Sequence, residues 1–103
     1  MYANICPTMI DTAHLLEQTH ESYDEFRELI EPNKQMEMAI GLIESHLKGR
    51  QNYERAIFAI SDIEEQVRHE MRFVTRFPGK VGKAASSALA TLLECAAQMR
   101  LVI

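Results

Sequence analysis

Residues 84–103 read AASSALATLLECAAQMRLVI, with one acidic residue, Glu94, and one basic residue, Arg100. Apolar residues recur in this stretch at spacings of three and four, which places them on one face of an α-helix; they are Ala85, Leu89, Leu92, Ala96, Met99 and Ile103. Polar residues form only a narrow second stripe, so we expect a mostly buried helix that contacts more than one neighbour and does not span a membrane. We expect Leu101, Val102 and Ile103 to pack on the bundle or on a second subunit.

The same spacing recurs in earlier parts of the chain, and no stretch alternates as a strand would. The sequence therefore predicts an all-α protein, a four-helix antiparallel bundle forming a single domain over residues 1–103. We expect the four helices at residues 9–30, 34–48, 52–76 and 83–102. The second helix is the shortest and would leave part of the bundle uncovered. That gap and the apolar residues 101–103 together predict a homodimer.

Residues that start and stop helices separate these stretches. Thr8 is expected to cap the first helix, with Asp11 at its third position. Asn33 can cap the second helix, and Gly49 suits the left-handed position at its end. Pro78 and the glycine after it are expected to end the third helix.

Composition limits the function. The chain has 103 residues, 47% of them hydrophobic and 25% charged, as is typical of a globular domain. Its formal net charge of −4 disfavours general affinity for nucleic acid, which depends on Lys and Arg. Cys6 and Cys95 lack metal-site spacing, so we expect reduced thiols. The first ten residues lack the features of a secretion signal, and we expect a cytoplasmic protein.

One short motif suggests phosphoryl transfer. Residues 44–49 read ESHLKG, and the segment His46, Lys48, Gly49 resembles the motif of histidine phosphotransfer domains, which are also small helical bundles. The resemblance implies a signalling domain that carries phosphate on His46. In that family two residues separate the His from the Lys, whereas here only Leu47 lies between them. A two-residue step on a helix turns through about 200°, which places Lys48 nearly opposite His46.

Two further groups of residues could in principle serve metal binding or nucleophilic catalysis. Glu17 and His20 have the E-x-x-H spacing of di-iron bundles, and the nearby His14 or the pair Glu65 and His69 could add ligands. Glu17 and His20 flank the apolar stripe, which predicts a solvated face. For nucleophilic catalysis the sequence offers only a cysteine in the buried last helix and two serines near its start, without a recognisable motif. We therefore expect no catalytic residue, no metal ion, no cofactor and no enzymatic activity.

Charge is divided unevenly along the chain. Residues 11–31 contain seven acids and one base, whereas residues 68–83 contain five bases and one acid. Residues that share a face of the third helix, or lie beside it, suggest a basic binding surface: Arg68, Arg72 and Arg76, with Phe73 and Phe77. An acidic surface is predicted on the first helix at Glu21, Asp24, Glu25 and Glu28. Charged faces of this kind can steer a partner into place, while apolar anchors hold it.

The sequence thus predicts a non-enzymatic protein that binds another protein through a charged helix face. It would act as a regulator, an inhibitor, an immunity-type protein or a chaperone-like adaptor, in the manner of a small bacterial or phage accessory protein. Two alternatives remain open: a histidine phosphotransfer domain that uses His46, and a small nucleic-acid-binding regulator that uses the stripe of Arg68, Arg72 and Arg76.

Overall fold

The computed structural model describes residues 11–50 and 52–103. They form four α-helices and no strand: α1 (Thr12–Leu29), α2 (Lys34–Ser45), α3 (Tyr53–Val74) and α4 (Gly79–Val102). A π-helical turn, η1 (His46–Arg50), follows α2. Within this turn Gly49 has a left-handed φ of 106°, as predicted. The predicted all-α four-helix bundle is confirmed.

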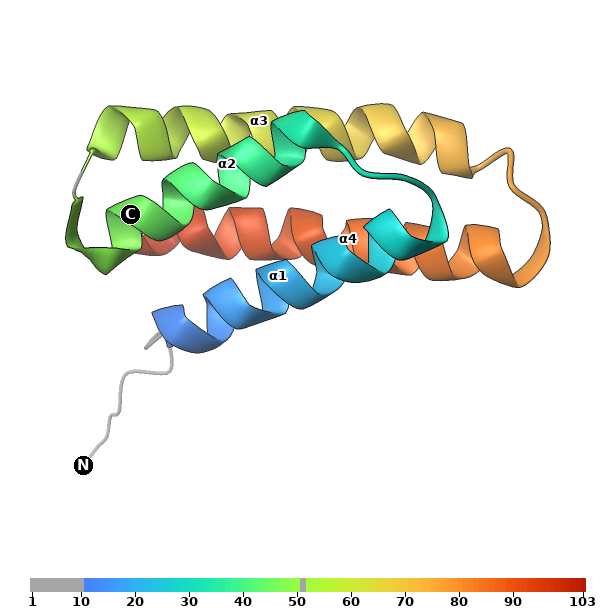
Figure 1. Ribbon diagram of the computed structural model, residues 1–103, viewed down its shortest axis with the longest axis horizontal. Coiled ribbons are helices and arrows are strands. Elements are labelled where there is room, and N and C mark those ends of the chain that lie inside the picture. Colours follow the sequence, from blue (N-terminus) through green and yellow to red (C-terminus); the bar gives the residue numbers. More distant parts are fainter. Residues whose placement is uncertain (1–10, 51) are drawn as a thin grey trace.

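The helices run antiparallel in two layers (Figure 1). α3 and α4 form one layer, α1 packs on α4, and α2 packs on α3. Few residues of α1 and α2 contact each other, although the two helices follow each other in the chain. The gap expected beside the shortest helix therefore lies between α1 and α2.

The core is built as the periodicity of residues 84–103 predicts. α4 lies against both α1 and α3, and its apolar stripe from Ala85 to Met99 is buried. Val102 and Ile103 pack against this core, but Leu101 is 79% exposed. The expected packing on the bundle is confirmed for Val102 and Ile103, and the packing of Leu101 on a second subunit stays a prediction.

Three helix ends lie within a few residues of the predicted ones. Asp11 is the N-cap of α1, because its Oδ1 accepts hydrogen bonds from the backbone N–H groups of Ala13 at 3.0 Å and His14 at 3.2 Å. It is therefore not at the third position, and Thr8 lies outside the described residues. α2 ends at Ser45, where η1 begins, and α3 ends at Val74. Asn33 caps α2 as predicted, with its side chain 3.0 Å from the Met36 N–H.

The turn between α3 and α4 is tighter than predicted. α4 begins at Gly79, four residues before the expected start, because Pro78 acts as its N-cap residue and Gly79 adopts a φ of 71°. Gly82 is consequently inside the helix and buried against the Phe77 carbonyl group. The early start brings the C-terminal end of α3 close to α4, and this holds the basic residues of α3 at one end of the bundle.

Candidate partner-binding surfaces

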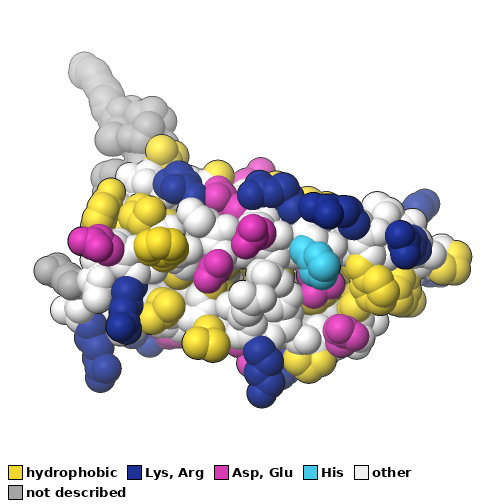
Figure 2. All heavy atoms as spheres, turned by 90° about the horizontal axis from the view of Figure 1, so that it is seen from above, with side chains coloured by type: hydrophobic (Ala, Val, Ile, Leu, Met, Phe, Trp, Pro, Cys, Tyr) yellow, Lys and Arg dark blue, Asp and Glu magenta, His cyan; other side chains and the backbone are white. Residues whose placement is uncertain are grey.

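The arginine ridge consists of Arg68, Arg72 and Arg76, all of which are exposed. Arg68 and Arg72 lie on α3, whereas Arg76 lies in the turn after it, where its N–H donates to the Phe73 carbonyl at 3.1 Å. Looking onto α3 from above, Figure 2 shows basic side chains in a row. Within residues 11–50 and 52–103, no carboxylate forms an ion pair with the ridge. The three guanidinium groups therefore have no ion-pair partner in the described part of the chain.

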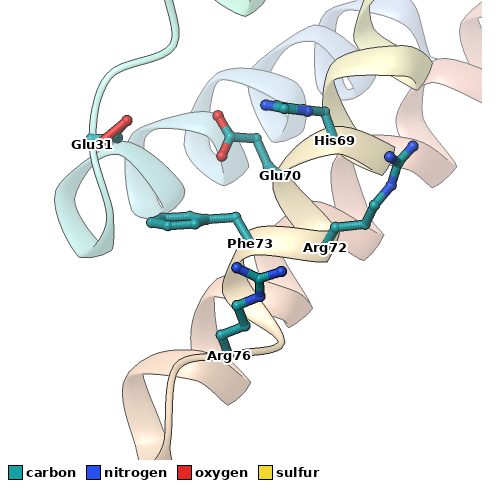
Figure 3. A pocket seen from close by; sticks show the side chains of 6 residues that line it. All are labelled: Glu31, His69, Glu70, Arg72, Phe73 and Arg76. Atoms are coloured by element: carbon teal, nitrogen blue, oxygen red, sulfur yellow. The ribbon is translucent and has the colours of Figure 1, made fainter.

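A hollow of about 340 Å³ opens beside the ridge (Figure 3). Its lining combines predicted and unpredicted residues: Arg72, Phe73, Arg76, His69, Glu70 and Glu31. Phe73 is 41% exposed and meets Phe77 edge to face, with ring centroids 5.1 Å apart. Phe77 is half-buried and Arg68 does not line the hollow. The structure therefore brings Arg72, Phe73 and Arg76 together, supported by Phe77.

A polar network that the sequence did not predict fixes the edge of this hollow. The Asn33 side-chain amide donates to Glu70 Oε2 at 2.8 Å and to Gln66 Oε1 at 2.9 Å. The Asn33 backbone N–H donates to the Tyr23 hydroxyl at 2.8 Å, and that hydroxyl donates to Glu37 Oε2 at 2.6 Å. Burial of Tyr23, followed by its bond to Glu37, raises the Tyr23 pKa to about 12. The network connects the α1–α2 loop to α3. It also gives the buried carboxylate of Glu70 a hydrogen-bond donor, the side-chain amide of Asn33.

The predicted acidic surface is exposed on α1, but its four residues do not share one environment. Glu21 and Asp24 border a hollow between α1 and η1, whereas Glu25 and Glu28 do not. Asp24 lies 3.9 Å from Arg27, its neighbour one turn along the helix. In the described ranges no ion pair connects these acids with the arginine ridge, so the molecule presents two oppositely charged surfaces.

His46 has a different environment from the one that the phosphotransfer resemblance implies. It is half-buried in η1, and its Nδ1 atom is buried without a hydrogen-bond partner in the structure. Lys48 Nζ lies 2.8 Å from Glu44 Oε2, so its charge is directed towards Glu44. His20 Nε2 lies 3.1 Å from Glu44 Oε1. Bonding to Lys48, and secondarily to His20, holds the Glu44 pKa below its usual value.

The remaining candidate residues do not assemble into a site. Across residues 11–50 and 52–103, no three His, Cys, Asp or Glu side chains come close enough to share a metal ion. His20 pairs with Glu44, so the predicted solvated face at Glu17 and His20 is only partly exposed. Cys95 is a free thiol in the core, and burial raises its pKa above the usual value. Cys6 lies outside the described residues.

Comparisons with models of protein families, with curated proteins and with solved structures find no match for this chain. No helix in the described part of the chain is both long and apolar enough to cross a membrane.

Proposed function

We propose that this chain is a non-enzymatic regulatory or adaptor protein that binds an acidic protein partner through the arginine ridge. One observation carries the proposal: the ridge arginines are exposed and form no ion pair within the described residues, and Arg72 and Arg76 line the same hollow as the half-exposed ring of Phe73. A surface that combines unpaired arginines with an aromatic side chain has the composition found at the centres of protein interfaces.

The chemistry of arginine favours an acidic partner. A guanidinium group can bind a carboxylate through two parallel hydrogen bonds, which fixes orientation as well as adding attraction. The ring of Phe73 would supply apolar contact beside these charges. The charges would set the rate and orientation of the encounter, and the ring would slow dissociation.

Reversal of two ridge charges tests this proposal. We expect R72E with R76E to keep the helical fold, because both residues are exposed, and to abolish partner capture from native lysate. The matched control is R50E with R55E, which makes the same change of net charge at two exposed arginines outside the ridge. Quantitative mass spectrometry of the captured proteins compares the variants. Equal capture by the wild type and R72E/R76E would remove the assignment.

Nucleic acid is the second candidate partner, because the same unpaired arginines could contact phosphates. Three arginines neutralise at most about three phosphates, so the logarithm of affinity should fall with the logarithm of salt concentration with a slope of no more than about −3. A gel-shift titration at several salt concentrations measures this slope. Absence of a shift at low salt excludes this candidate.

The expected homodimer is also a proposal. It is supported by Leu101 and by Leu93, which is 36% exposed on the same helix. A second subunit would remove these side chains from water. Light scattering of the purified protein measures the subunit number, and a monomer at all concentrations contradicts the proposal. A cytoplasmic location is likewise proposed and can be checked by cell fractionation.

A further inference from the structure

We propose that the groove between α1 and α2 binds a basic amphipathic helix of another protein. This second binding surface is separate from the arginine ridge, and the proposal does not depend on the ridge having a partner.

The groove lies where α1 runs beside the end of α2 and η1 without close packing, since few residues of α1 and α2 contact each other. The part of the groove between α1 and η1 is a hollow of about 520 Å³, within the range of binding pockets. Leu16 of α1 and Leu47 of η1 line the hollow, and both are half-buried and pack on the core. These two leucines give the hollow an apolar floor in contact with the rest of the bundle.

Two polar contacts connect the walls of the groove. His20 Nε2 lies 3.1 Å from Glu44 Oε1, and Tyr23 donates to Glu37 at 2.6 Å. Between these contacts lies a second hollow of about 220 Å³, lined in part by Ile40 and Gly41. The groove is therefore already formed in the described structure, and a partner would not need to separate the helices.

The charge of the rim selects the partner. Glu17, Glu21 and Asp24 border the hollow on the α1 side, and all three are exposed. Lys48 and His20 also line this hollow, and both pair with Glu44, at 2.8 Å and 3.1 Å. An acidic rim repels nucleic acid and acidic proteins, whereas Lys and Arg beside an apolar stripe complement both rim and floor.

The shape of the groove favours a helix as the occupant. A helix presents apolar residues at positions i, i+3, i+4 and i+7 on one face, and such faces bind in apolar grooves between helices. Its apolar side chains would enter the hollow while its backbone lies above the rim. Basic side chains on its flanks would then reach Glu17 and Glu21.

The test uses the full chain and a fluorescently labelled synthetic helix, with leucines at i, i+3, i+4 and i+7 and lysines elsewhere. Fluorescence anisotropy measures the affinity. We expect binding, and a loss of about tenfold or more for E17K with E21K on the rim. The control is E25K with E28K, which makes the same charge change on the same helix away from the groove; we expect a loss of no more than about threefold.

A second pair of peptides tests the apolar floor. Replacing the leucines of the synthetic helix by serines keeps its charge, and we expect this to weaken binding by about tenfold or more. R72E with R76E should bind the basic helix as the wild type does, so a failure of the arginine ridge proposal can be distinguished from a failure of this one.

Several outcomes would overturn the proposal. Equal losses for the rim variant and its control would mean that only overall charge matters. Equal affinity for the leucine and serine peptides would mean that the apolar floor is not used. If light scattering shows that the basic helix dissociates copies of the chain from one another, a second copy is the occupant instead.

Discussion

The Tyr23 hydroxyl joins three parts of the chain, since it bonds to Asn33 in the loop and to Glu37 on α2. Y23F removes these bonds from two partly buried partners, so we expect it to destabilise the fold by about 1–2 kcal/mol at neutral pH. The Tyr23 pKa is raised from 10.0 to about 12, so the hydroxyl stabilises the fold fully below pH 10. Because the unfolded chain loses this proton first, that stabilisation is lost as the pH rises from about 10 to about 12.

The difference in stability between wild type and Y23F should therefore narrow over this pH range. Urea denaturation at pH 7 and at intervals above pH 9 measures it, and the subtraction removes contributions from other titrating groups. A difference that stays constant up to pH 12 would contradict the assigned pKa. A Y23F variant as stable as the wild type at pH 7 would show that the network contributes no net stability.

For single residues, the sequence predicted contacts between neighbours along the chain and missed contacts between residues that are far apart in it. Asn33 was recognised as a cap because an asparagine before a helix bonds to a backbone N–H three residues later. Its second role, as a donor to Glu70 on α3, joins residues that are 37 positions apart. No spacing rule connects such residues, because their contact depends on how α2 packs on α3. His69, Glu70 and Glu31 were missed as members of the hollow for the same reason.

Among the helices, the apolar periodicity was sufficient to predict the buried face of α4 but not the residue at which α4 begins. The three–four spacing correctly predicted its buried face, but the glycine-containing segment before residue 83 was expected to be a connection. Gly82 is helical because a residue without a side chain allows the helix to pass against the Phe77 carbonyl. From the sequence alone, a glycine that permits such a close contact inside a helix cannot be distinguished from a glycine in a loop.

Substitution of Gly82 tests this explanation. A Cβ atom there would overlap the Phe77 carbonyl oxygen and lie 3.1 Å from its carbon, so we expect G82A to destabilise the fold by about 1–3 kcal/mol. Gly41 is the control, because it is exposed in α2 and an added Cβ meets nothing within 4 Å. There we expect G41A to stabilise the fold by up to about 1 kcal/mol, as alanine does in a helix. Thermal and urea unfolding measure both, and a stabilised G82A would contradict the proposed contact.

For the whole molecule, the sequence predicted two charged zones but not their relation to the groove. Charge counts identified the acids of α1, but not which of them border the groove: Glu21 and Asp24 line it, whereas Glu25 and Glu28 do not. A short second helix predicted that a gap would exist, but the sequence did not indicate which helices would border it.

The two charged surfaces belong to different helices and different layers, since α1 packs on α4 while the arginine ridge lies on and just after α3 (Figure 1). Effects of distant sites without shared partners usually add. We therefore expect the combined variant E17K, E21K, R72E and R76E to lose both activities to the same extent as the separate pairs. Anisotropy with the basic helix and capture of the acidic partner measure the two effects in one set of proteins. A change of more than about threefold in affinity at the groove on reversal of the ridge would contradict this independence of the two surfaces.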